Sequence, residues 1–335
     1  MSGRRRRKQS ASLRVLAGVL AVAATVGGGG TGYAAPGAKP PTVCAKGCQY
    51  ASIQAAVDAA PEGATITVGP GVYAGGVTIE RSVTLVGAGA RRTVIAGSPG
   101  ANVVEAVTGD VVLQGLTISG GATGVGVSFF PRVTIRDSVI TGNVWGTGGF
   151  GGSISLQRSL VIRNSTAGVG PIFSGGATVE DSTVSGNGVG VLGDSRMLVV
   201  VKDSLILGNR DTGIGMAGGT LEVYGSTIRG NSGVNGGGIA LYVGRAGASA
   251  TVVDSRITKN TASGKGGGVF IDILSTLTLR NTKVFKNTAQ KGGGVYNGGE
   301  WQTEQNFFSI ESRIWNNTPD DYLEECDPVV RACSP

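Results

Sequence analysis

The feature that most constrains the fold is a short pattern that recurs through most of the chain. It reads apolar-x-apolar-x-Asp-Ser-x-apolar-x-x-Asn, and clear copies are VTIRDSVITGN, ATVEDSTVSGN and VVVKDSLILGN. The asparagines that close its eight copies, 21 to 30 positions apart, are Asn143, Asn164, Asn187, Asn209, Asn231, Asn260, Asn287 and Asn317. A recurring unit of this length is the sequence signature of a solenoid, in which each repeat stacks on its neighbours.

Each repeat contains short runs in which apolar and polar side chains alternate, which is the period of a β-strand and not of a helix. If three such strands complete one coil, equivalent strands stack in parallel about 4.8 Å apart. Their inward Val, Ile and Leu side chains then form one continuous core. We therefore predict an all-β fold, a single-stranded right-handed parallel β-helix of about ten coils over residues 50–318.

Two aligned polar columns argue against a β-sandwich, which also shows alternating strands and turns. A coil stacks like residues into ladders, and we interpret both columns as structural. Besides the asparagines, the second column consists of Ser138, Ser159, Ser182, Ser204, Ser226, Ser255, Thr282 and Ser312. The chain has 60 glycines, and we expect clusters such as 236–238, 266–268 and 292–294 to supply positive-φ corners between coils.

The first 34 residues have the layout of a secretory signal. A basic cluster is followed by an apolar stretch from Leu13 to Val26 and by small residues at Ala34 and Ala35. The apolar stretch is about fourteen residues long, whereas a membrane span needs roughly twenty. We predict a signal peptide at 1–34, a secreted or cell-surface mature protein, and no membrane span after cleavage.

The positive charge of the chain is concentrated in that signal segment. Of 29 Lys and Arg residues, six precede residue 35, which leaves 23 basic against 22 acidic residues. A nearly neutral mature chain gives little support for attraction to polyanions, so nucleic acid is not an expected partner.

Two close pairs of cysteines flank the repeats. They are Cys44 with Cys48 and Cys326 with Cys333. In an exported protein such pairs favour local disulfides, which we place in a linker at 35–49 and in a C-terminal cap at 319–335.

A short helix is expected directly before the first repeat. Ser52 can cap its N-terminus, and Pro61 stops it. Its apolar face consists of Ile53, Ala56, Val57 and Ala60. Such a helix would cover the open end of the solenoid, which otherwise exposes unpaired backbone groups.

The segment YASIQAAVDAAPEGATITVGPGVYAGGVTI, followed by SVTLVGAG and TVIAG, resembles the start of pectate lyase-like superfamily proteins, pectin methylesterases above all. The later NTASGKGGGVF and VFKNTAQKGGGVYNGG resemble the repeats of polymorphic outer-membrane proteins. Together these segments span nearly all of residues 50–317. The resemblance implies a right-handed parallel β-helix, and it is specific for fold and not for activity.

Departures from the resemblance narrow the possible chemistry. The chain has no His, so it lacks the Gly-His-Gly of polygalacturonases, and it lacks the Asp-Phe-Ile-Phe-Gly and Leu-Gly-Arg-Pro-Trp strings of pectin methylesterases. The absence of His also removes the usual nucleophile triads. The route that remains is β-elimination from an acidic sugar by a Lys or Arg base, for which lyases of this fold often use calcium.

A candidate binding face is formed by the first strand of each coil. Side chains alternate between the two sides of a strand, so every second one faces outward. We take the inward positions to be Val127, Val191, Ile239, Val269 and Val295. The outward set is then Phe130, Asp194, Tyr242, Phe270, Asp272 and Tyr296. The predicted substrate-binding residues are Tyr242, Arg245, Phe270, Asp272 and Tyr296. Their rings can stack on sugars, or alternatively on each other to protect the sheet.

Asp194 and Arg196 are the close acid and base on that face, which makes them candidate catalytic residues. An ordinary surface ion pair is the alternative. Calcium needs six or more oxygen ligands, and each coil offers single carboxylates. We therefore expect no cofactor. Calcium would be expected only if the protein is a lyase.

These observations predict an exported β-helix protein that binds polysaccharide or cell-envelope material through its first-strand face without catalysis. Two alternatives stay open. One is a polysaccharide lyase that acts on an acidic polysaccharide by β-elimination, and the other is a structural surface protein or adhesin. Whether the protein is an enzyme, and its oligomeric state, are left open by the sequence.

Overall fold

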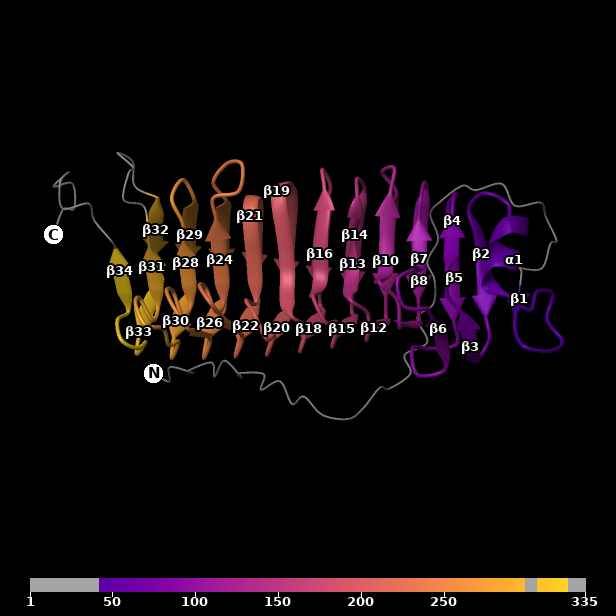
Figure 1. Cartoon of the computed structure of the whole chain (residues 1–335), viewed down its shortest axis with the longest axis horizontal. Helices are drawn as coiled ribbons and strands as arrows, with labels where there is room; N and C mark the ends of the chain where they lie inside the picture. The colour runs from indigo at the N-terminus through magenta and orange to yellow at the C-terminus, as the bar shows by residue number, and fades with distance from the viewer. Residues whose placement is uncertain (1–41, 299–305, 325–335) are drawn as a thin grey trace, which may run out of the picture. The chain divides into compact units, whose positions relative to one another are not determined.

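The computed structural model describes residues 42–298 and 306–324. Within them, parallel strands from successive coils lie side by side in chain order, from α1 at the indigo end to β34 in yellow (Figure 1). This confirms the predicted all-β solenoid. The signal segment 1–34 and the pair Cys326 and Cys333 lie outside the described residues, so both stay predictions.

Each coil contributes three strands, which stack into three faces named by their order in the coil. The first-strand face contains β4 (Val77–Ile79), β7 (Asn102–Ala106), β10 (Thr123–Ser128), β13 (Trp145–Phe150), β16 (Ala167–Phe173), the first parts of β19 (Val189–Lys202) and β21 (Ile214–Tyr224), β24 (Ile239–Tyr242), β28 (Val269–Ile271), β31 (Val295–Asn297) and β34 (Tyr322–Glu324). The second-strand face contains β1 (Thr42–Val43), β2 (Ala64–Val68), β5 (Val83–Gly87), β8 (Asp110–Gln114), β11 (Arg132–Arg136), β14 (Ser153–Gln157), β17 (Gly176–Glu180), the later parts of β19 and β21, β25 (Ser249–Val253), β29 (Thr276–Arg280) and β32 (Phe307–Ile310). The third-strand face contains β3 (Gly71–Ala74), β6 (Thr93–Ala96), β9 (Thr117–Ser119), β12 (Val139–Thr141), β15 (Leu160–Ile162), β18 (Thr183–Ser185), β20 (Leu205–Leu207), β22 (Thr227–Arg229), β26 (Arg256–Thr258), β30 (Lys283–Phe285) and β33 (Arg313–Trp315).

The third-strand face is an 11-stranded sheet, one strand for each coil, so the solenoid has slightly more coils than the ten predicted. The first two faces form one 21-stranded sheet because β19 and β21 run through both. A small sheet of β23 (Ser232–Gly233) and β27 (Thr261–Ala262) follows the asparagines of two longer repeats. Pairing of β1 with β2 and of β34 with β31 extends the stack on either side of the predicted range 50–318.

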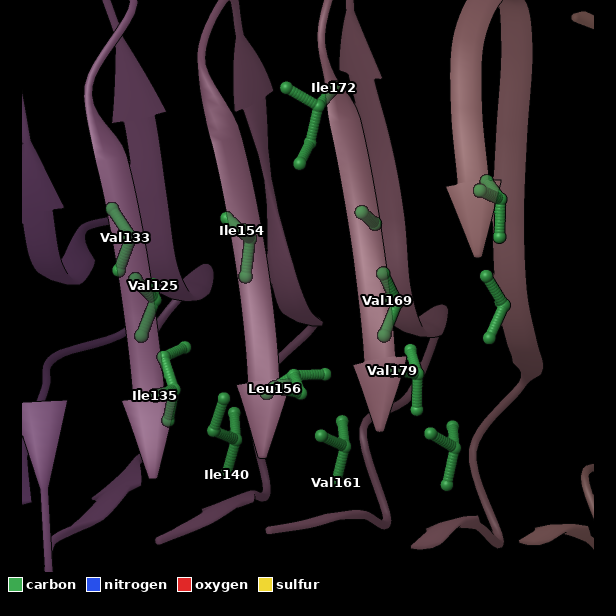
Figure 2. Close-up of a cluster of buried hydrophobic side chains, with 14 of the residues drawn as sticks. Val125, Val133, Ile135, Ile140, Ile154, Leu156, Val161, Val169, Ile172 and Val179 are labelled. Carbon is green, nitrogen blue, oxygen red and sulfur yellow. The ribbon is translucent and has the colours of Figure 1, made fainter. Parts of the chain in front are cut away.

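Side chains from all three faces meet in one core. Val125 from β10, Ile135 from β11 and Ile140 from β12 are fully buried and point into the space between the strands (Figure 2). The valines and isoleucines predicted to point inward from the first strand, including Val127 and Val269, are buried as well. Each such side chain stabilises the fold by about 1.5–3 kcal/mol relative to exposure.

The asparagine column forms a buried ladder. In its middle, the Asn187 amide nitrogen Nδ2 donates to Oδ1 of Asn209 at 3.1 Å, and the backbone N–H of Asn187 donates to the same oxygen at 3.0 Å. The ladder ends at Asn317, whose Nδ2 donates to the carboxylate of Asp321 at 3.0 Å. The serine column bonds in the same manner, for example from Ser182 N to Ser204 Oγ at 3.1 Å. Both columns are therefore structural, as predicted.

Positive-φ corners precede both ladders. Asp181 stands directly before Ser182 with φ 46°, and Gly186 stands directly before Asn187 with φ 63°. In the glycine clusters only the first member is such a corner, as at Gly266 with φ 68°. The last member is needed for space, because a Cβ on Gly268 would lie 3.0 Å from the Asn287 amide. The predicted role of these clusters is thus only partly correct.

The N-terminal helix and the first disulfide are as predicted. Helix α1 (Ile53–Ala59) begins at Ser52, whose hydroxyl accepts a hydrogen bond from the Ala55 N–H at 3.2 Å. Its buried face packs against β1, β2 and β4 in the first coils. Cys44 and Cys48 form a disulfide just before it.

Candidate functional site

The predicted aromatic shelf is a stack in which Phe270 and Tyr296 are buried and Tyr242 is half-buried. Tyr242, Phe270 and Tyr296 lie on consecutive coils, with ring centroids 5.7 Å apart for the first pair and 5.6 Å for the second. Phe270 and Tyr296 are 7% and 1% exposed. The prediction that these rings form an exposed surface is therefore wrong, and the rings stack on each other as in the alternative.

Loops of the longer repeats contact this stack. The Tyr242 hydroxyl donates to the carbonyl oxygen of Asn235 at 3.4 Å. The Lys265 ammonium donates to the Tyr296 hydroxyl at 2.5 Å and lies 4.5 Å from the centroid of that ring. Burial raises the pKa of Tyr242, and the nearby Asp211 and Asp272 carboxylates raise it further. The loops that contact these rings are irregular, so strand alternation in the sequence could not predict them.

The candidate catalytic pair is not an ion pair. The Asp194 carboxylate accepts a hydrogen bond from the Ser195 N–H at 2.6 Å, and Arg196 is exposed. Across 42–298 and 306–324, the ion pairs within 4.0 Å are Arg158 with Asp137 and Lys202 with Glu180. The structure therefore supports neither the ion-pair alternative nor a preformed acid–base contact.

Arg245 contacts the Asp194–Arg196 segment through its backbone, and Asp272 contacts the loop that carries Arg245. The Arg245 N–H donates to the Ser195 hydroxyl at 3.3 Å. The Asp272 carboxylate accepts from the Val243 N–H at 3.4 Å and thereby holds the same loop. These candidates lie where the first strand of a coil passes into its second strand, in loops for Arg245 and Asp272 and within β19 for Asp194 and Arg196. We name this region the first corner.

The first corner also carries an exposed row of phenylalanines. Phe129 and Phe130 are 73% and 69% exposed, and Phe150 and Phe173 are 63% and 47% exposed. Phe150 is in register with Phe173 on the next coil, their ring centroids being 6.3 Å apart. We name these four residues the phenylalanine row. Single exposed apolar residues are ordinary, but four exposed phenylalanines on three successive coils, two of them in ring contact, indicate an interaction surface.

Backbone strain accompanies the row. Phe129 has φ 56° and Phe130 has φ 66°, the left-handed region that bulky side chains avoid. Each such residue costs about 1–2 kcal/mol. The fold thus holds two large apolar side chains in solvent at a corner whose φ is shared elsewhere by shorter polar residues such as Asp181.

Cations flank the row at the same corner. Arg132 begins β11 two positions after Phe130, and Arg196 lies in β19 on the coil after Phe173. Arg245 lies two coils beyond Arg196. All three are exposed. No group of three or more His, Cys, Asp or Glu side chains able to hold a metal occurs in the described ranges.

Sequence reasoning found Phe130 but missed Phe150 and Phe173. It aligned first strands over five residues from a leading Gly-Val or Gly-Ile pair. WGTGGF lacks such a pair, and in AGVGPIF Phe173 lies one position beyond the five aligned residues. The signal was present in FFPR, FGGS and FSGG, where Phe immediately precedes a turn in three successive coils.

None of the helices in the described part of the chain is long and apolar enough to cross a bilayer.

Structural comparison finds the same fold in polysaccharide-modifying enzymes. Pectate lyase Pel9A has 16% identity and a TM-score of 0.54, with 84% of this chain and 82% of the lyase covered. The A-module of the Azotobacter vinelandii mannuronan C-5 epimerase AlgE4 has 15% identity and a TM-score of 0.50, with 82% and 92% covered. At these identities the likeness concerns the fold alone.

Sequence comparison with curated proteins found no significant match. The resemblance to polymorphic outer-membrane proteins stays a prediction. A family model described as a right handed beta helix region matches residues 76–252 and 158–308, which together span more than half of the chain. The chain therefore belongs to the right-handed β-helix family.

Proposed function

We propose that the protein binds a linear polysaccharide along the phenylalanine row and does not catalyse a reaction on it. The observation that carries the proposal is the exposure of four phenylalanines on three successive coils, two of them in a strained backbone. An exposed aromatic cluster that costs stability is hard to explain by folding alone.

The chemistry of the row suits a sugar polymer. Aromatic faces pack on the apolar C–H faces of sugar rings, and the coils repeat every ~4.8 Å, so successive sugars can meet successive rings. Arg132, Arg196 and Arg245 supply planar donors at the same corner. Guanidinium groups bind carboxylates in a bidentate manner, which favours an acidic sugar at that end of the site.

The comparisons support the same class of partner. The names of the two similar structures state actions on pectate and on mannuronan. The predicted signal peptide at 1–34 is consistent with these partners, because it places the mature chain outside the cell. A secreted or cell-surface location is therefore part of the proposal.

A lyase that acts by β-elimination is the second candidate. It is favoured by the contact of the Arg245 loop with the Ser195 hydroxyl, which gathers Asp194, Arg196 and Arg245 at one corner. A lyase needs one of these bases to take the α-proton and another to neutralise the substrate carboxylate. The same samples used for binding can test this, because elimination creates an unsaturated, absorbing product.

The binding test uses the full chain with pectate, alginate and a neutral galactan in isothermal titration. The double variant Phe150→Ala with Phe173→Ala should bind at least one polymer about tenfold more weakly, since each ring contact contributes about 0.5–1.5 kcal/mol. Phe308→Ala is the matched control, because Phe308 is 42% exposed on the second-strand face. It should bind like the natural sequence.

Three outcomes would contradict the proposal. Equal affinity of the natural protein and the double variant would remove the phenylalanine row as the site. Absence of binding to any polymer would favour the adhesin alternative. Growth of ultraviolet absorbance on incubation with pectate or alginate, with or without calcium, would establish the lyase instead.

A further inference from the structure

A second charged surface lies on the third-strand face, away from the first corner. Arg256 on β26 is the Cα partner of Lys283 on β30, and Lys283 is the partner of Arg313 on β33. All three side chains are exposed. Three cations therefore stand in one file on three consecutive coils, about 4.8 Å apart.

Further cations border this file. Lys259 and Lys286 follow β26 and β30 directly, are exposed, and share φ 56°. Arg229, at the end of β22, is exposed on the preceding coil. We name the whole set the basic face. Its members are Arg229, Arg256, Lys259, Lys283, Lys286 and Arg313.

One carboxylate borders the basic face, because Glu311 lines a pocket together with Lys283 and Arg313. The ion pairs within 4.0 Å found among the described residues involve none of its members. Two carboxylates, Asp254 and Glu311, stand at the turns before β26 and β33. Asp254 instead accepts a hydrogen bond from Asn281 at 2.5 Å. Like charges directly opposite each other destabilise a sheet, so this file is a cost to folding.

We propose that the basic face binds a linear acidic polysaccharide, as a second site separate from the phenylalanine row. A regular file of cations at the coil spacing matches a polymer whose charges repeat along a chain, because each coil can meet one successive anionic group. The overall near-neutrality of the mature chain conceals this site, since the charge is local. The proposal stands whether or not the phenylalanine row binds a glycan.

A polysaccharide suits the face better than single-stranded nucleic acid. Proteins that bind single strands combine cations with aromatic rings on which bases stack. The aromatic rings at this face, Phe285 and Trp315, are already stacked on each other, with centroids 4.7 Å apart and planes at 12°. The face thus offers three cations in a regular file beside a single ring pair, of which Trp315 is 38% exposed. The oligothymidylate arm of the test below separates the two kinds of polymer.

The test measures binding of oligogalacturonates to the full chain carrying Phe150→Ala and Phe173→Ala, so that the contribution of the phenylalanine row is reduced. Adding Arg256→Gln, Lys283→Gln and Arg313→Gln should weaken binding at least about tenfold. The matched control removes the same charge from exposed turns elsewhere. Its substitutions are Lys46→Gln, Arg91→Gln and Arg92→Gln. A charge-keeping variant, Arg256→Lys with Arg313→Lys, should retain most of the affinity.

Salt dependence supplies a second readout, because exposed charges are screened over about 8 Å at physiological ionic strength. Affinity should fall steeply with added salt in the control and only weakly in the triple Gln variant. Equal losses in the triple variant and its charge-matched control would overturn the proposal. So would absent binding of oligogalacturonate, or tighter binding of an oligothymidylate of equal length. All of these outcomes can be measured in the chain that carries Phe150→Ala and Phe173→Ala, so they can be told apart from failure of the phenylalanine row as a binding site.

Discussion

At the scale of single residues, substitution of Phe129 should change stability and polysaccharide binding in opposite directions. Its side chain is 73% exposed, and its φ of 56° suits glycine. We therefore expect Phe129→Gly to raise the free energy of unfolding by about 1 kcal/mol, because it relieves left-handed strain. The same variant should bind polysaccharide more weakly. Urea titration and calorimetry measure the two effects.

The control for this prediction is Phe150→Ala, which changes an exposed ring with no positive φ. It should weaken binding without a gain in stability. If Phe129→Gly instead destabilises the protein, then Phe129 has a packing role, and its strain does not indicate function.

We expect the free energy of unfolding to fall at alkaline pH because of the Tyr242 hydroxyl. Burial raises its pKa above the ordinary value of 10.0, helped by the carboxylates of Asp211 and Asp272. Above that pH the unfolded chain loses this proton first, so the folded state binds more protons and stability falls as pH rises. Tyr242→Phe should show a shallower decline above pH 10 in thermal unfolding. Identical pH profiles for both proteins would contradict the assignment.

At the scale of elements, the asparagine ladder is expected to stabilise the stack more than its number of polar groups suggests. Asn209→Ala would leave the buried backbone N–H of Asn187 without an acceptor. It would also remove one of two hydrogen bonds from Asn187 Nδ2, which still donates to the Val161 carbonyl oxygen. Each unsatisfied buried group costs about 1–3 kcal/mol. We expect a loss of about 2–4 kcal/mol in urea unfolding.

Asn281→Gly is the matched control for that experiment. Asn281 is exposed, and its φ of 44° is compatible with glycine. Its loss should change stability by about 0.5 kcal/mol or less. A similar small loss in Asn209→Ala would show that the ladder does not stabilise the coils.

The glycines of the coils serve two different needs, and substitution should separate them. A Cβ on Gly190 would meet the Gly213 carbonyl oxygen and lie 2.7 Å from the Asn209 amide nitrogen. Gly190→Ala should therefore cost about 1–3 kcal/mol through overpacking. Gly208 has φ 59° with open space around it, so Gly208→Asn should cost less. Equal thermal shifts in the two variants would contradict this distinction.

Much of the element level could be predicted from sequence because it repeats. The Asn209 ladder, the inward Val127 and the Ser52 cap follow from spacing and alternation, which depend on local chemistry. The burial of Tyr296 could not be predicted in that way. It depends on the Gly-rich loop that brings Lys265 onto the ring, and alternation carries no information about irregular chain that folds back over a strand.

At the scale of the whole solenoid, stacking turns separate turn residues into continuous surfaces. Phe130, Phe150 and Phe173 are about twenty positions apart in sequence, yet the coils set the last two rings 6.3 Å apart. The basic face arises in the same way from Arg256 and Arg313. The sequence predicted the coil but not these surfaces, because each coil varies in turn length and thus shifts the alignment of its exposed residues.

The most direct measurement of the central claim is a crystal structure of the full chain with an oligosaccharide of the polymer that binds best in titration. The account predicts sugar rings packed on Phe130, Phe150 and Phe173, with the oligosaccharide crossing successive coils at the first corner. An oligosaccharide bound at saturating concentration elsewhere on the solenoid, with the phenylalanine row uncovered, would contradict it.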